Sequence, residues 1–284
     1  MKSISIIYII LFIFNTLQAQ QHEVITVENA EEFVEAIGSN RIIQLKGNTI
    51  YLSELGADRN GENFYYQECY DGHELVINNV VNMKIIGLGA KPVKIITKPT
   101  YGDVIEFKNC EKIHISNVDA GHGPEKGGCV GGVFHFIEST NISIDKSIMY
   151  GSGIEGITAE KTTNLKCTQS IIRGCTYSIM TLTESSNFEF EGCEFSDNKE
   201  YDLVNMNGCS KIKFSKCVFG NNQTGLEDFS DYALFNIENS SQIALKDCKI
   251  ENNSTLYLCK SKNSIDFGNT KKENNSFKKG EYKQ

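Results

Sequence analysis

The sequence predicts an all-β solenoid of short parallel strands, on three observations. A motif in which alternating apolar residues lead to Ser or Cys recurs along most of the chain. Its Ser or Cys falls at Ser147, Ser170, Cys193, Cys217 and Cys248, at intervals of 23, 23, 24 and 31 residues. A repeat in this range is typical of a solenoid. Within each repeat, apolar and polar residues alternate with the period of a strand, and no repeat contains a helical run.

Composition excludes several other classes of protein. The 284 residues are 40% hydrophobic and 23% charged, with 24 Gly and 3 Pro. This chain is too apolar to be disordered and too poor in proline to be collagen-like. The formal net charge is -8, and the only arginines are Arg41, Arg59 and Arg173. Nucleic acid is not an expected partner, because its phosphates need clustered Lys and Arg.

Residues 1–19 have the layout of a secretory signal peptide. Lys2 precedes an apolar run at 4–14, and a polar stretch ends at Ala19. This order predicts cleavage after Ala19 and a secreted or periplasmic protein. The run is too short for a membrane span, and no second run of spanning length is expected to remain after cleavage. Without Lys2 the chain has 27 basic and 36 acidic residues, a net charge of -9.

Residues 20–45 are expected to form an N-terminal cap. Two strand-like segments, 24–27 and Arg41–Leu45, flank a predicted helix at 29–37. Asn29 is the expected N-cap of this helix, and Gly38 follows its last residue. Such a helix would cover the open first coil, whose strand edges would otherwise be free to aggregate.

Residues 46–268 carry the repeat. Two of its copies read TNISIDKSIM at 140–149 and SNFEFEGCEF at 186–195. Two or three short strands in a coil of about 22 residues resemble the right-handed parallel β-helix, or pectate-lyase-like, superfamily. The resemblance implies one solenoid domain and no particular activity. The remaining residues, 269–284, are polar and Lys-rich, and are expected to form a loose cap or a disordered tail.

Ten cysteines in an exported chain suggest disulfides, but repeat position indicates otherwise for most of them. Seven occupy positions that other coils fill with Ser or core Ile, where small residues stack into a ladder whether or not sulfurs bond. The seven expected to be reduced are Cys110, Cys167, Cys193, Cys209, Cys217, Cys248 and Cys259. Cys69 and Cys129, in predicted loops, are better disulfide candidates, and Cys175 occupies a turn. Zinc is not expected, because no Cys-x-x-Cys spacing occurs.

Alignment of the coils predicts which polar side chains line the outer face of one sheet. Parallel strands lie about 4.8 Å apart, so Glu106 and His135 should be neighbours. A carboxylate beside an imidazole can raise the pKa of the histidine and orient it, as in a general base. The alternative is a surface ion pair of little consequence. The predicted outward row is Glu106, His135, Thr158, Thr181, Asn205 and Asn236.

A glycine-rich insertion, 119–132, lengthens the coil beside this pair. Its six glycines let the backbone fold tightly or approach a ligand, and insertions on a rigid solenoid often carry function. Asp119 and His122 could therefore converge on the pair, with Tyr150 and Arg173 at the turns of the next coils. We expect acid–base roles for Glu106, His135, His122 and Asp119. We expect substrate contacts from Thr158, Thr181, Asn205, Tyr150 and Arg173.

Two motifs of the resembling enzymes are incomplete. Gly121, His122 and Gly123 match the Gly-His-Gly element of polygalacturonases, but the paired-Asp and Arg-x-Lys elements are missing. Pectate lyases hold calcium in a cluster of acids. Asp103, Glu106 and Asp119 are candidate acids, yet no three acids fall on successive coils of one row. Calcium is compatible with the sequence and is not demanded by it.

The leading hypothesis is an exported, monomeric solenoid that binds or cleaves polysaccharide, as a lyase or a hydrolase if it is catalytic. Repeated hydroxyl and amide side chains along a groove suit a chain of sugars. The negative net charge disfavours a strongly anionic sugar unless a cation mediates. A second insertion, 221–232, either forms the far wall of the groove or is only a longer loop that the fold tolerates. The alternative hypothesis is a non-catalytic surface or adhesion solenoid.

Overall fold

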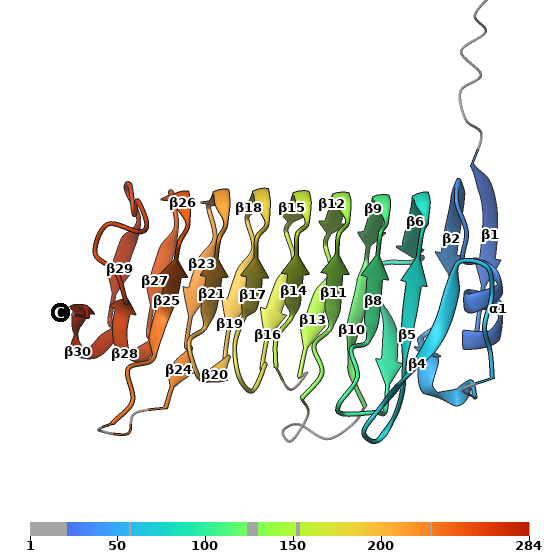
Figure 1. Cartoon of the computed structure of the whole chain (residues 1–284), viewed down its shortest axis with the longest axis horizontal. Helices are drawn as coiled ribbons and strands as arrows, with labels where there is room; N and C mark the ends of the chain where they lie inside the picture. The colour runs from blue at the N-terminus through green and yellow to red at the C-terminus, as the bar shows by residue number, and fades with distance from the viewer. Residues whose placement is uncertain are drawn as a thin grey trace, which may run out of the picture.

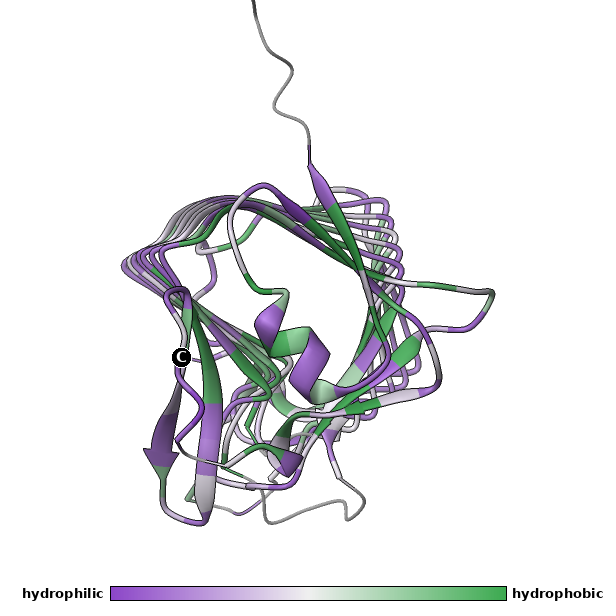
Figure 2. Cartoon of the chain, turned by 90° about the vertical axis from the view of Figure 1, so that its right-hand side faces the viewer, coloured by the Kyte–Doolittle hydropathy of each residue, from purple (hydrophilic) through white to green (hydrophobic). Residues whose placement is uncertain are grey.

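The described part of the chain forms a right-handed parallel β-helix, a long prism with three faces (Figures 1 and 2). The computed structural model describes residues 22–56, 58–123, 130–151, 154–225, 227 and 229–283. The predicted signal peptide and Cys129 lie outside the described residues. No helix within the described ranges is long and apolar enough to cross a membrane.

Three sheets run along the prism, each built from strands of successive coils. Sheet A contains β1 (Glu23–Val27), β2 (Arg41–Leu45), β6 (Val81–Gly87), β9 (Glu111–Ser116), β12 (Thr140–Asp145), β15 (Thr163–Thr168), β18 (Ser186–Glu191), β22 (Ser210–Ser215) and β26 (Ser241–Lys246). Sheet B contains β3 (Thr49–Tyr51), β7 (Val93–Thr97), β10 (Val118–His122), β13 (Ile148–Tyr150), β16 (Ile171–Arg173), β19 (Glu194–Ser196), β23 (Val218–Gly220), β27 (Lys249–Glu251) and β29 (Lys271–Glu273). Sheet C contains β4 (Phe64–Cys69), β5 (Gly72–Asn78), β8 (Ile105–Lys108), β11 (Phe134–Ile137), β14 (Ile157–Glu160), β17 (Met180–Thr183), β20 (Lys199–Glu200), β21 (Val204–Asn207), β24 (Gln223–Thr224), β25 (Ala233–Glu238), β28 (Ser254–Cys259) and β30 (Ser276–Tyr282). The hairpin of β4 and β5 is antiparallel, and the other pairings of described strands are parallel.

A short helix, α1 (Ala30–Glu35), lies across the N-terminal end of the coil (Figure 2). The side chain of Asn29 caps it by accepting a hydrogen bond from the backbone N–H of Glu32 at 2.9 Å, as the sequence predicts. Phe33 and Val34 are fully buried, so the helix covers apolar interior that the first coil leaves open. The helix ends before Gly38, and a 3-10 turn, η1 (Leu52–Glu54), follows β3.

The interior is filled by side chains that stack on their equivalents in the next coil. Phe190 and Phe214 lie nearly parallel, with ring centroids 4.8 Å apart. A buried asparagine ladder runs along one corner. The side-chain amide of Asn198 donates to Oδ1 of Asn222 at 3.0 Å, and that of Asn222 donates to Oδ1 of Asn253 at 2.9 Å. Stacking thus satisfies polar groups that burial would otherwise leave unpaired.

The seven cysteines of the repeat are buried thiols, as the sequence predicts. The sulfurs of Cys193 and Cys167 lie 3.7 Å apart, and Cys193 Sγ donates to the Cys167 carbonyl oxygen at 3.3 Å. These contacts are hydrogen bonds within a stack and not disulfides. Burial raises the pKa of Cys110 to about 11, so its thiol stays protonated. Cys69, which we expected in a loop, ends β4 instead, and its Sγ donates to Asp71.

The last coils extend beyond residue 268. We expected residues 269–284 to form a loose cap or a disordered tail. Instead, β29 pairs with β27 and β30 pairs with β28, both in parallel. Phe277 and Tyr282 pack against the core from β30. In the sequence, the many lysines of this segment obscure the alternation of inward and outward residues that places these two rings inward.

Left-handed backbone at the corners lets each coil return to register. Positive φ angles recur just after a sheet C strand, at the second residue of a sheet A strand and just after that strand. In one coil these residues are Glu138, Asn141 and Lys146, with φ of 49°, 59° and 46°. Residues other than Gly and Asn adopt this conformation at a cost of about 1 kcal/mol or more each. The fold therefore accepts local strain at its corners in exchange for continuous stacking.

Replacing a strained corner residue by glycine should stabilise the protein. Glu184 has a φ of 49°, and Gly208 occupies the same corner one coil later. Glu184→Gly should therefore raise the free energy of unfolding by about 0.5–1 kcal/mol, because glycine carries no penalty there. Thr183→Gly, one residue earlier inside β17, is the matched control and should lower it by a similar amount. Urea unfolding measures both. A destabilised Glu184→Gly protein would contradict this account of the corners.

Candidate functional site

The predicted outward row lies on the outer face of sheet C, in the predicted register. Glu106 in β8 pairs with His135 in β11, and His135 pairs with Thr158 in β14. The row continues through Thr181, Asn205 and Asn236. Alignment of the core residues was sufficient to predict these neighbours, because the register of parallel coils also determines which side chains adjoin on the outer face.

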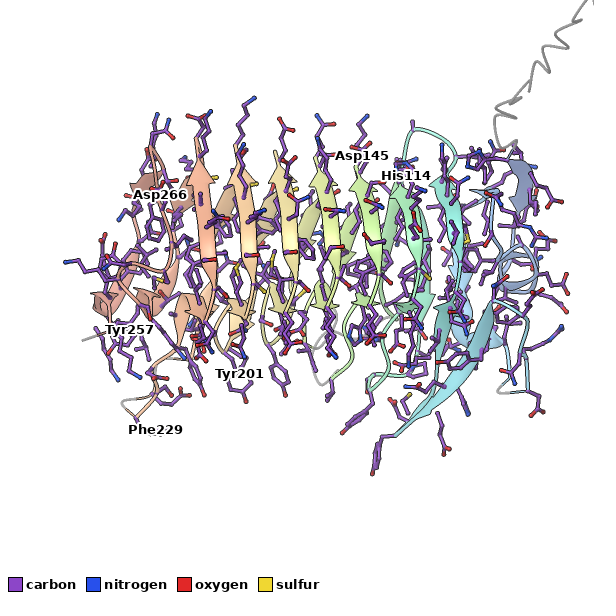
Figure 3. The ribbon with its side chains drawn as sticks, turned by 45° about the horizontal axis from the view of Figure 1, so that its top comes forward. His114, Asp145, Tyr201, Phe229, Tyr257 and Asp266 are labelled. Atoms are coloured by element: carbon purple, nitrogen blue, oxygen red, sulfur yellow. The ribbon has the colours of Figure 1, made fainter. Side chains whose placement is uncertain are left out.

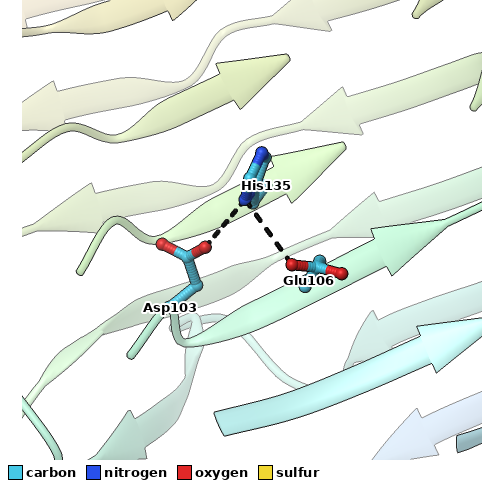
Figure 4. A group of neighbouring side chains, drawn as sticks. All are labelled: Asp103, Glu106 and His135. Carbon is cyan, nitrogen blue, oxygen red and sulfur yellow. Dashed lines mark hydrogen bonds and ion pairs between the residues drawn. The ribbon is translucent and has the colours of Figure 1, made fainter. Parts of the chain in front are cut away.

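The closest partner of His135 is Asp103, in the loop before β8 (Figure 4). His135 Nδ1 lies 2.9 Å from Asp103 Oδ2 and 3.7 Å from Glu106 Oε2. Asp103 is held in place because its Oδ1 accepts a hydrogen bond from the backbone N–H of Gly132 at 2.5 Å. His135 Nε2 is buried and has no hydrogen-bond partner among the described residues. Its nearest carboxylate oxygen is that of Glu160, at 3.6 Å.

The surrounding carboxylates favour a protonated histidine. Burial lowers the pKa of His135, but the hydrogen bond to Asp103 and the negative charges of Asp103, Glu106 and Glu160 outweigh burial, so the pKa is raised. Burial in turn raises the pKa of Glu106. Both shifts make these side chains keep their protons to a higher pH than they would in water. The group is therefore suited to donating a proton.

A second buried acid, Glu74 in β5, supports this group from the preceding coil. Its Oε2 accepts a hydrogen bond from the backbone N–H of Asp103 at 2.6 Å, and its Oε1 accepts one from Gln67 Nε2 at 2.9 Å. The pKa of Glu74 is raised to about 7, mainly by burial; the hydrogen bond from Asp103 lowers it, and the charges of Asp103 and Glu106 raise it. Glu74 thus positions Asp103.

A third buried acid, Glu155, lies on the other side of His135 along the row. Its Oε1 accepts a hydrogen bond from the Thr158 hydroxyl at 3.0 Å. Its Oε2 accepts hydrogen bonds from Ser178 at 2.6 Å and from Thr181 at 3.2 Å. Burial raises the pKa of Glu155. The two threonines therefore point their hydroxyl hydrogens at Glu155 and keep their oxygen lone pairs for another donor.

Asp119, Tyr150 and Arg173 lie on sheet B and not beside His135. The glycine-rich segment begins as β10, so Asp119 faces outward from a different side of the prism. Tyr150 pairs with Arg173, whose guanidinium lies 5.4 Å from the centroid of the tyrosine ring. The expected convergence of these residues on Glu106 is therefore not observed. The remainder of the insertion, 124–129, lies outside the described residues.

His122 is a positioning residue rather than a member of the acid–base group. Its side chain is buried, and Nε2 lies 2.7 Å from the carbonyl oxygen of Gly102. Burial lowers the pKa of His122, so the ring is neutral at neutral pH and Nε2 donates to this carbonyl. This contact fixes the residue just before Asp103. We assigned His122 an acid–base role from the sequence, and its geometry does not support that role.

Three acids beside the row share one repeat position; from the sequence we named Asp103 only as a candidate calcium ligand and missed the other two. Asp103, Glu155 and Asp202 each lie three residues before an outward residue of the row. This position is the last turn of the loop from sheet B to sheet C, where a side chain can reach over the outer face. Comparing the coils at this position would have identified these acids as a group.

The residues of this group do not fit calcium. Asp103, Glu106 and His135 offer ligand atoms within 4.8 Å of one another. Calcium takes six to eight oxygen ligands, whereas one of these three atoms is an imidazole nitrogen. Asp103 Oδ1 and both oxygens of Glu74 already accept hydrogen bonds from N–H groups. Such a mixed nitrogen and oxygen set resembles sites for zinc or manganese more closely.

Comparisons with known proteins agree with the fold. A family model described as a right handed beta helix region matches residues 102–279. A pectate lyase from Paenibacillus sp. 0602 has a TM-score of 0.54 at 10% identity, over 69% of this chain and 60% of its own. A tailspike protein of Acinetobacter baumannii bacteriophage Fri1, a capsular polysaccharide depolymerase, has a TM-score of 0.51 at 10% identity, over 92% and 55%. A pectate lyase from Bacillus sp. N165 in complex with trigalacturonate has a TM-score of 0.50 at 13% identity, over 91% and 82%.

At these identities the likeness shows the fold alone. This chain spans about 60% of the first of these structures and 55% of the tailspike. No curated protein sequence matches the chain. The function must therefore be argued from the site.

The buried acid Glu74 should make stability depend on pH. Its pKa rises from 4.5 to about 7 on folding, so between these values the folded protein keeps a proton that the unfolded chain has lost. Stability should fall as the pH rises through this range, by about 3 kcal/mol from this residue. Glu74→Gln should therefore unfold with a higher free energy than wild type at pH 8 and a similar one at pH 4.

Urea unfolding at a series of pH values measures this difference. Glu184→Gln, at an exposed corner, is the matched control and should follow the wild-type profile. Parallel profiles for Glu74→Gln and wild type would contradict the assignment of a titrating, buried carboxyl group to Glu74.

Proposed function

Because the chain belongs to the right-handed β-helix family, we propose that it binds a polysaccharide along the outer face of sheet C and cleaves it beside Asp103, Glu106 and His135. The observation that carries this proposal is the 2.9 Å contact between Asp103 and His135 at one end of the polar row. An oriented, charge-stabilised imidazole is what acid–base chemistry requires. An adjacent row of hydroxyl and amide groups is what a sugar chain requires.

The raised pKa values of the acid–base group favour hydrolysis over elimination. Cleavage of a glycosidic bond by hydrolysis needs a group that protonates the leaving oxygen. The raised pKa values of His135 and Glu106 keep protons available for this step. Asp103 holds Nδ1, so Nε2, which has no hydrogen-bond partner among the described residues, is the nitrogen of His135 left to donate a proton. Elimination, the reaction of a lyase, would instead need a base that has lost its proton.

A second candidate function is binding without cleavage. The side chains of Glu106 and His135 are only 7% and 16% exposed, which favours a structural role for their contact. In this case the protein is a solenoid that attaches to glycans on a surface. The same row of side chains would bind the sugar chain, and the acid–base group would only stabilise the coil.

Loss of the acid–base group should distinguish these functions. We expect reducing ends to be released from at least one plant, algal or host polysaccharide by the wild type. His135→Ala and Asp103→Asn should each lower this rate at least about 100-fold. His114→Ala is the matched control, because His114 faces outward from sheet A and contacts Ser143; its rate should equal that of wild type. Undiminished turnover in His135→Ala would refute the proposed site, and binding without turnover would favour the second function.

We propose further that residues 1–19 direct export of the protein. A tagged full-length chain expressed in a bacterium should be recovered outside the cytoplasm, with Gln20 as its first residue. Edman sequencing or intact-mass measurement tests this. A variant with an Arg in the apolar run, Ile9→Arg, should stay uncleaved in the cytoplasm. Cytoplasmic recovery of an uncleaved wild-type chain would contradict export.

A further inference from the structure

Three tyrosines, with rings tilted or edge-to-face to one another, are in contact on the loops that lead from sheet B to sheet C; Tyr201 is exposed, and Tyr177 and Tyr232 are half-buried. Tyr177, Tyr201 and Tyr232 come shortly before β17, β21 and β25. Successive ring centroids lie 5.0 Å and 5.2 Å apart, so one ring follows another at the spacing of the coils. Figure 3 shows Tyr201 and Phe229 along one edge of the prism, away from His114. We call Tyr177, Tyr201 and Tyr232 the tyrosine ladder.

Internal packing does not account for the tyrosine ladder. The Tyr201 side chain is 44% exposed and that of Phe229 is 91% exposed. The hydroxyl groups of the three tyrosines have no hydrogen-bond partner in the part of the chain that the structure describes. Exposed aromatic surface that gathers in one place usually marks a binding surface. A tyrosine ring offers an apolar face and a polar hydroxyl at once.

The floor beside the tyrosine ladder is polar, and no lysine or arginine among the described residues lines its pocket. Thr181, Asn205 and Asn236 line a shallow pocket of about 80 Å³ on the outer face of sheet C. The side-chain oxygen of Asn236 accepts no hydrogen bond from the described residues. Of the acids nearby, Asp202 forms an ion pair with Lys260 at 2.6 Å, whereas Glu238 lines the pocket itself. Amide and hydroxyl groups of this kind bind sugar hydroxyls and offer no cation for a carboxylate.

The opposite end of the same face is rich in carboxyl groups. Glu74, Asp103 and Glu106 lie around His135, and no lysine or arginine forms an ion pair with these three acids in the described ranges. A polyuronate lying along the face would bring its carboxylates against these acids. An uncharged sugar chain would not.

We propose that the tyrosine ladder is a stacking platform for uncharged pyranose rings, and that it selects neutral polysaccharides over polyuronates. This inference rests on the proposed function, which places the glycan along sheet C. The chain of sugars runs parallel to the axis of the prism. Its rings lie against the tyrosines while its hydroxyl groups bond to Thr181, Asn205 and Asn236. Its far end then reaches His135, four coils before the last of these residues.

Affinity electrophoresis with defined polymers tests this inference. Gels contain hydroxyethyl cellulose, xyloglucan or galactomannan as uncharged polymers, and polygalacturonate or alginate as anionic ones, all with EDTA. We expect wild type to be retarded by at least one uncharged polymer and by neither anionic one. Tyr201→Ala and Tyr232→Ala should each lower the affinity measured from this retardation about tenfold, which is what one aromatic contact contributes. Tyr201→Trp should preserve it.

Tyr51→Ala is the matched control. Tyr51 is 42% exposed but lies on sheet B, so this variant should bind like wild type. If Tyr201→Ala and Tyr232→Ala were retarded as much as wild type, the tyrosine ladder would not be a binding platform for sugars. The proposed function would be unaffected by that result. Retardation by polyuronate alone would overturn the preference for uncharged sugars. Absence of retardation of wild type by every polymer would overturn this inference together with the proposed function.

Discussion

Backbone hydrogen bonds between equivalent strands of successive coils are the interaction on which the rest of the structure depends. Each coil must return to the same position, displaced by about 4.8 Å along the axis. The corners achieve this with left-handed residues, including glutamates and lysines that are strained there. Once the register is set, equivalent side chains stack. Stacking of equivalent side chains accounts for the phenylalanine stacks, the buried asparagine ladder and the reduced cysteines.

The same constraint builds the outer surface. On sheet C it converts a sequence spacing of one coil into physical contact, so that Glu106 adjoins His135 and Thr181 adjoins Asn205. A solenoid therefore presents its outward side chains as a row along one face and not around a cleft. Acid–base character arises where residues from the loops reach over this row. Asp103 and Glu155 do so because each lies at the end of a loop that enters sheet C.

Charge divides the outer face of sheet C into two regions. Near β8 and β11, buried acids share a face with one histidine, and burial raises the pKa of Glu74 and Glu106. Near β21 and β25, the polar groups are amides together with the carboxylate of Glu238, and aromatic rings line the edge. In the proposed function the first region supplies protons and the second holds the chain of sugars. The two are coupled only through the rigid coil between them.

The amino-acid sequence alone determined the solenoid, the capping role of Asn29, the buried thiols and the neighbours within the outward row. All of these follow from a repeat whose period sets both strand and register. Tertiary structure alone decided which acid contacts His135, because Asp103 reaches the group from a loop and Glu74 from an antiparallel hairpin that breaks the repeat. It also placed His122 against Gly102 and Asp119 on sheet B. A repeat predicts contacts between equivalent positions, whereas contacts between unlike positions depend on where the loops fold.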